Sequence, residues 1–145
     1  MLSEMQRGAG FFLAVLVALA TAVIVSGCAE KPQIRMVYAS GSVKIKGAPA
    51  DNIMVQCMPD GIDGPTSSGI TDQDGRFVLK TDDGLEQAVV GKCKITLIDM
   101  NEGRPPQGET APPPRISAQY TIAGPRGLSD EVRDDGKSIE IDITN

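Results

Sequence analysis

Cysteine and aspartate side chains carry most of this sequence's potential for chemistry, because the chain contains no histidine. Without histidine it lacks the commonest general base, the usual partner of a nucleophilic serine and the commonest metal ligand. Asp82-Asp83 and Asp134-Asp135 offer paired carboxylates, but neighbours in a strand point to opposite faces. A glycine follows each pair, which is typical of a turn. The sequence therefore predicts a protein that is not an enzyme, with no catalytic residues and no cofactor.

The segment from Thr71 to Phe77 brings two carboxylates close together, which raises the alternative of a calcium loop. An EF-hand loop needs glycine at its sixth position, where Phe77 stands here, so we expect at most an incidental weak site and no dedicated metal site. Asp-Gly between two strand-like runs is instead a strong hairpin signal, because glycine adopts positive φ without a steric penalty. The predicted structural turn comprises Asp72, Asp74, Gly75 and Phe77.

Residues 1–27 have the features of a secretion leader. The stretch from Phe11 to Val25 is apolar in all but one position. A membrane-spanning helix needs about 20 apolar residues, whereas a signal-peptide core uses roughly 7 to 15, so the length favours a signal peptide. Glu4 departs from the usual positive start, which leaves Arg7 and the terminal amine as the positive charges. The alternative interpretation is an uncleaved membrane helix from Gly8 to Gly27.

The thiol of Cys28 comes directly after this leader. The residues before it, Val25, Ser26 and Gly27, resemble the lipobox of bacterial lipoproteins. The resemblance implies cleavage before Cys28 and attachment of lipid to its thiol. Two or three acyl chains would anchor the protein stably, because a single chain holds only marginally. We therefore expect a lipid-anchored protein of the cell envelope, outside the cytoplasm, with the membrane as a partner.

The rest of the chain has the pattern of an all-β sandwich. Short segments of alternating polar and apolar residues are separated by Gly, Pro and Asp. Strands are predicted at residues 42–46, 52–59, 67–71, 92–98 and 138–144, and the segment 52–59 is apolar nearly throughout, which predicts a central strand. We expect Phe77 and Leu79 to point inward and Thr96 to face solvent. Residues 28–39 are predicted to be a tether and residues 40–145 the domain, with 120–132 either a strand or an irregular arm.

Five segments together resemble small bacterial lipoproteins that carry a carboxypeptidase regulatory-like domain. They are Ser40–Val43, Gly47–Pro49, Val55–Pro59, Thr71–Phe77 and Gly91–Ile95. The resemblance covers residues 40–144 and implies a single transthyretin-like, prealbumin-type β-sandwich of about seven strands. Its most specific part, the turn ending at Phe77, is structural in the family and implies no active site. The domain is a non-catalytic accessory of carboxypeptidases, and this chain has no room for the peptidase itself.

Cys57 and Cys93 depart from this family, which usually has bulky apolar or aromatic residues at these places. Both lie on predicted inward faces, so we expect them to meet across the core. With Cys28 carrying lipid, they form an even pair in a compartment that permits a disulfide. A bridge would close a loop of roughly 37 residues and add about 3 to 4 kcal/mol of stability. Two buried free thiols are the alternative, because free cysteine packs as a small hydrophobe.

Composition narrows the choice of partners. The formal net charge is −5 and the lysines and arginines form no cluster, which argues against nucleic acid. Residues 101–115 are proline-rich and predict an exposed loop, which is either a stiff connection or a docking segment for a protein partner. Carbohydrate-binding modules generally present aromatic platforms, and few aromatic residues occur here. We therefore expect a structural or protein-interaction module, with carbohydrate binding as the alternative.

Overall fold

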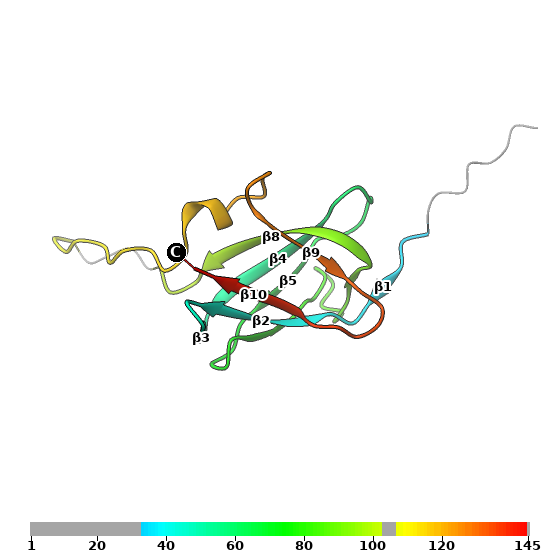
Figure 1. Ribbon diagram of the computed structural model, residues 1–145, viewed down its shortest axis with the longest axis horizontal. Coiled ribbons are helices and arrows are strands. Elements are labelled where there is room, and N and C mark those ends of the chain that lie inside the picture. Colours follow the sequence, from blue (N-terminus) through cyan, green and yellow to red (C-terminus); the bar gives the residue numbers. More distant parts are fainter. Residues whose placement is uncertain (1–32, 103–106, 145) are drawn as a thin grey trace, which may run out of the picture. The chain divides into compact units, whose positions relative to one another are not determined.

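The computed structural model describes residues 33–102 and 107–144, which form an all-β domain (Figure 1). Val25, Ser26, Gly27 and Cys28 lie outside the described residues. The strands are β1 (Met36–Val37), β2 (Ser40–Ile45), β3 (Ala48–Pro49), β4 (Ile53–Pro59), β5 (Ser67–Ile70), β6 (Arg76–Val78), β7 (Ala88–Val89), β8 (Gly91–Asp99), β9 (Leu128–Val132) and β10 (Ile139–Ile143). A 3-10 turn, η2 (Ala118–Tyr120), precedes β9. Because β1, β3 and β7 are only two residues long, the longer strands agree with the sandwich of about seven strands that the sequence predicts.

Two four-stranded sheets build this sandwich. One has the order β10-β2-β3, with β6 also paired to β2, and the other has the order β5-β4-β8-β9. Only β10 runs parallel to its partner, β2, and the other pairs are antiparallel. Backbone hydrogen bonds between Ser68 and Lys80, both 2.8 Å long, join the two sheets at one side. The sandwich is therefore closed where β5 approaches β6.

One apolar core fills the space between the sheets, because their strands alternate inward and outward side chains. Its fully buried members include Val43, Ile53, Val55, Leu79, Ile95, Leu97 and Ile143. In β10 the three isoleucines are buried while Glu140 and Asp142 are exposed, which confirms the alternation expected there. Phe77 and Leu79 also point inward as predicted.

The predicted turn at Asp72 is present and its hydrogen bonds explain its sequence. The Oδ1 atom of Asp72 accepts hydrogen bonds from the backbone N–H groups of Asp74 and Arg76, both at 2.9 Å. Gly75 has φ +73°, and a Cβ there would lie 2.5 Å from the carbonyl oxygen of Val43. Glycine is therefore required twice over, by its backbone conformation and by its close approach to β2. The turn is structural, as the sequence indicates.

The structure differs from the sequence predictions at two places and decides a third that the sequence leaves open. The chain joins the domain before residue 40, because Met36–Val37 pairs with Ala88–Val89. For residues 120–132 the sequence allows either a strand or an irregular arm. Residues 128–132 form the strand β9, which pairs with β8. Thr96 was expected to face solvent, but it is buried and its hydroxyl donates to Oε1 of Gln56 at 3.2 Å. This polar pair across β4 and β8 explains why a threonine can be covered there.

Candidate functional site

A groove of about 1040 Å³ follows β6 on the outside of the sandwich, at the side where β5 approaches β6. Outward-facing side chains of β2 form one wall, and those of β4 and β5 form the other. Residues 80–86, which follow β6, close one end. Ligand pockets usually have volumes of about 300–1,000 Å³, and the groove is at the upper end of this range, so it is large enough for a segment of a partner molecule. It is therefore the candidate binding site of the domain.

The apolar wall comes from two paired strands. Met54 and Ile70 are directly opposite each other in the register of β4 and β5, and both line the groove. Ile70 is 52% exposed. On the other side of β4, Met54 pairs with Ile98, which is also exposed. Apolar side chains thus continue from the groove across the outer face of the second sheet.

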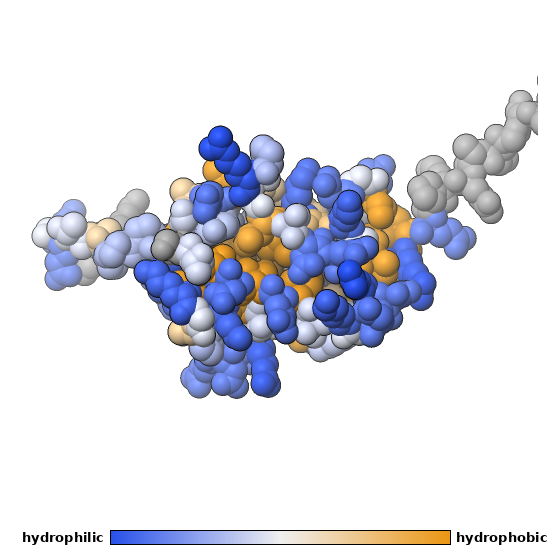
Figure 2. All heavy atoms as spheres, viewed as in Figure 1, coloured by the Kyte–Doolittle hydropathy of each residue, from blue (hydrophilic) through white to orange (hydrophobic). Residues whose placement is uncertain are grey.

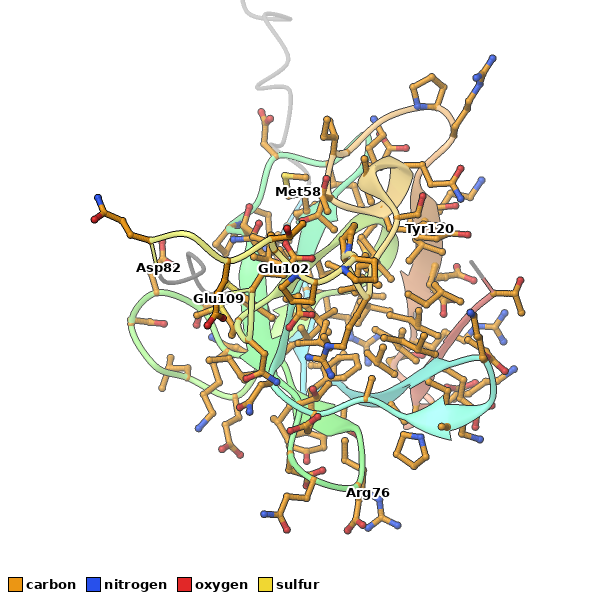
Figure 3. All side chains as sticks on the ribbon, turned by 90° about the vertical axis from the view of Figure 1, so that its left-hand side faces the viewer. Met58, Arg76, Asp82, Glu102, Glu109 and Tyr120 are labelled. Carbon is orange, nitrogen blue, oxygen red and sulfur yellow. The ribbon has the colours of Figure 1, made fainter. Side chains whose placement is uncertain are left out.

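The other wall is polar and carries charges. Ser40 and Ser42 line it from β2, and Lys80 forms an ion pair with Glu86 at 3.1 Å at one end. At the other end Arg76 forms no salt bridge with any of the described residues. Figure 3 shows Arg76, the first residue of β6, beside the preceding turn and pointing away from the body of the domain. This end of the groove therefore offers a free cation to a partner.

Glycines shape the floor of the groove. A Cβ on Gly69 would overlap the carbonyl oxygen of Val78, because the backbones of β5 and β6 cross closely there. Gly41, which also lines the groove, is covered by the ring of Phe77 on its inner side. The floor consequently exposes backbone and small side chains. This composition suits binding.

Aromatic side chains are scarce in the groove. Tyr38 lines it and is 58% exposed. Tyr120 is partly buried against the core, on the side where η2 leads to β9 (Figure 3). Phe77 is a core residue whose ring only reaches the groove floor. A stacking platform for a sugar would therefore rest on Tyr38 alone.

A separate polar cluster fixes the end of the proline-rich segment. Arg115 donates from Nε and Nη2 to the two carboxylate oxygens of Asp99, both at 2.6 Å. Its Nη2 also donates to the carbonyl oxygen of Asp51 at 3.1 Å. The next residue, Ile116, is buried in the core. Residues 107–114 are exposed as predicted, and the chain is then held firmly at Arg115, which favours the interpretation as a stiff connection.

Replacing Asp99 by asparagine is expected to lower the free energy of unfolding by about 1.5–3 kcal/mol, the range for hydrogen bonds to charged groups. The Asp99 side chain is only 2% exposed, so its two bonds to Arg115 are well shielded from water. Urea unfolding followed by circular dichroism measures the change. Asp51→Asn is the control, because that carboxylate is half exposed and 3.3 Å from Arg115; its effect should stay below about 1 kcal/mol.

The Asp99–Arg115 pair also predicts how the free energy of unfolding depends on pH. Hydrogen bonds from Arg115 hold the pKa of Asp99 below its ordinary value. A carboxyl whose pKa is lower in the folded state contributes its full stabilisation of the fold at pH values above its unfolded pKa of about 3.9. This stabilisation is lost as the pH falls through the pKa of the folded state. The difference between wild type and Asp99→Asn should therefore shrink in acid. An equal difference at neutral and acid pH would contradict the pairing.

Cys57 and Cys93 are both buried free thiols. In the register of β4 and β8, Cys57 is opposite Ile95 and Cys93 is opposite Pro59, so the cysteines are diagonal neighbours. They meet within one sheet and not across the core as expected. Hydrogen bonding to Cys93, together with burial, raises the pKa of the Cys57 thiol, which keeps it protonated and unreactive. A disulfide between them stays a prediction.

A scan of protein-family models found no match, and searches of curated proteins and of solved structures found none either. The resemblance to carboxypeptidase regulatory-like domains therefore stays a prediction. Within residues 33–102 and 107–144, no helix is long and apolar enough to cross a membrane. The same residues contain no group of three or more acidic or cysteine side chains placed to hold a metal ion. Asp82, Asp83, Asp134 and Asp135 all lie in turns, as expected.

Proposed function

We propose that this chain is a lipid-anchored protein of the bacterial cell envelope, and that its β-sandwich is a non-catalytic module that binds a protein partner. The anchor rests on Cys28 and the lipobox-like residues before it. The groove along β6 carries the proposal for the sandwich. Its apolar wall at Ile70, its polar wall and the free guanidinium of Arg76 are features that protein interfaces combine.

The alternative is a carbohydrate-binding module. One observation favours it, namely that Tyr38 is exposed at the rim of the same groove, near the hydroxyl groups of Ser40 and Ser42. Sugar sites generally stack rings on aromatic platforms, and here a single side chain would do this. An apolar wall and a free cation offer a protein partner more than one tyrosine offers a glycan. We therefore rank protein binding first.

Aspartate in place of Ile70 is expected to reduce capture of envelope proteins at least tenfold, because a charge would then face the apolar part of the partner. The measurement uses the lipidated mature protein as bait in detergent-solubilised envelope, with captured proteins quantified by mass spectrometry. Ile122→Asp is the matched control. Ile122 is an isoleucine of similar exposure, at 68%, and it does not line the groove.

The carbohydrate alternative is tested in parallel on a glycan array. Tyr38→Ala should leave protein capture largely intact if the partner binds the apolar wall. Glycan binding that disappears in Tyr38→Ala, without a protein whose capture depends on Ile70, would reverse the ranking. Equal protein capture by the Ile70 and Ile122 variants would also argue against the groove as the binding site.

A further inference from the structure

We propose that the end of the domain at β1 lies against the lipid bilayer and inserts the side chains of Ile34 and Ile62 into its surface. This inference rests on the proposed lipid anchor at Cys28. It assigns a lipid surface as the partner of a second region, separate from the groove. Ile34 is 45% exposed and Ile62 is 38% exposed. Figure 2 shows apolar atoms at this end of the sandwich, among hydrophilic ones.

Two contacts place the two isoleucines in one neighbourhood. The backbone N–H of Val90 donates to the carbonyl oxygen of Arg35 at 2.9 Å, which brings Ile34 beside the start of β8. A Cβ on Gly91 would lie 3.1 Å from Cδ1 of Ile62, so Ile62 packs over the next residue of the same segment. Both side chains therefore flank the small β1–β7 sheet. We call this region the β1 end.

The loop that carries Ile62 is held in place. The backbone N–H of Asp60 donates to the carbonyl oxygen of Lys92 at 2.9 Å, and the Asp60 carboxylate forms an ion pair with Lys94 at 3.0 Å. A Cβ on Gly64 would lie 2.8 Å from Cγ2 of Val89, so the loop also packs against β7. Because these contacts hold the loop, the exposed side chain of Ile62 keeps its position and is available for contact with an apolar surface.

The length of the chain before the domain selects the bilayer as the occupant. Cys28 and Ile34 are six residues apart in the sequence. Even a fully extended chain covers at most about 3.6 Å per residue, so Ile34 lies within roughly 20 Å of the anchored residue. By contrast, β8 runs away from the β1 end for nine residues, which is about 30 Å of strand. The opposite end, with residues 107–114, therefore faces away from the membrane unless the domain lies on its side.

Two charged side chains at the β1 end, Arg35 and Asp60, are paired, whereas Asp63 beside Ile62 is exposed and forms no salt bridge with the described residues. Arg35 forms an ion pair with Asp134 at 2.8 Å, in the turn between β9 and β10, and Asp60 is paired with Lys94. Opposite charges that are paired with each other give little net attraction or repulsion toward lipid headgroups. Contact should therefore depend on the isoleucines more than on the charge of the bilayer.

The experiment measures depth in the bilayer by fluorescence quenching. Lipidated mature protein, isolated from the membrane fraction, is reconstituted into vesicles of phosphatidylethanolamine and phosphatidylglycerol that contain a spin-labelled phosphatidylcholine. An environment-sensitive dye is attached to Asp63→Cys at the β1 end. Matched labels go to Ala111→Cys in the exposed proline-rich segment and to Asp82→Cys at the groove. The parent protein, whose Cys57 and Cys93 are buried, controls for background labelling.

We expect quenching at position 63 to exceed that at positions 111 and 82 severalfold, and to fall to their level when Ile34→Asp and Ile62→Asp are introduced. Vesicles without phosphatidylglycerol should give the same order. Equal quenching at 63 and 111 would overturn the contact, and strongest quenching at 82 would show that the domain lies on its groove side. Flotation of the vesicles separates the proposal of a lipid anchor at Cys28 from the proposal of bilayer contact at the β1 end. Protein that floats but is not quenched at 63 overturns this contact alone, whereas protein that does not float overturns the anchor as well.

Discussion

Alanine in place of Gly41 is expected to destabilise the domain by about 3 kcal/mol, the upper part of the range for overpacking and a large part of the 5–15 kcal/mol that holds a typical domain folded. Gly41 lies in the middle of the first sheet, between Phe77 on β6 and Ile139 on β10. A Cβ there would overlap the carbonyl oxygen of Ile139 and lie 2.5 Å from Cζ of Phe77. Neither the backbone nor a buried ring can move away cheaply in a close-packed core.

Urea unfolding followed by far-ultraviolet circular dichroism measures this effect, because the folded domain consists of sheet. Gly124→Ala is the matched control, since no atom lies within 4 Å of a Cβ at that position. Its midpoint should stay close to that of wild type. A Gly41→Ala protein that unfolds at the wild-type urea concentration would contradict the packing of Phe77 over Gly41, and with it the floor of the groove.

The sequence predicts the fold well wherever polar and apolar residues alternate strictly. In β10, Ile139, Ile141 and Ile143 alternate with acidic residues, and their burial follows directly. The Asp72 turn is equally predictable, because Asp-Gly has a specific conformational role. In β9, by contrast, Ser129, Asp130 and Glu131 are all exposed, and only the residues at the two ends reach inward. Pairing with β8 makes this segment a strand, and no local pattern reveals such pairing.

The groove could not be predicted from the sequence for a similar reason. Its walls come from strands far apart in the chain, and they meet only because Ser68 and Lys80 pair across the two sheets. Ile70 gave only a weak indication of a binding surface, because it is an apolar residue at the end of a short strand. Its exposure depends on the turn of β5 toward β6. The cysteines show the same limit. Their inward direction follows from alternation, but their place in one sheet follows from the register of β4 and β8.

Serine in place of Cys28 is expected to abolish lipid attachment completely, the largest single effect that we predict. The thiol is the acceptor that the lipobox-like sequence implies, and a hydroxyl cannot take its place as a thioether. Each buried CH₂ of an acyl chain contributes about 0.8 kcal/mol to membrane binding, so loss of two or three chains removes the anchor. Intact-mass analysis of the membrane fraction should give, for wild type, residues 28–145 plus the mass of the lipid.

Cys93→Ser is the matched control, because it removes another cysteine while leaving the lipobox-like residues in place, and its lipid mass should be retained. The mass also decides between the two interpretations of the leader. A membrane helix from Gly8 to Gly27 would keep residues 1–27 in wild type and Cys28→Ser alike, with no lipid on either. That pattern would contradict both cleavage and the anchor. The short link to Ile34 follows Gly27 as well as Cys28, so a membrane helix would still hold the β1 end near the bilayer, and the contact of Ile62 with lipid would then rest on the quenching experiment alone.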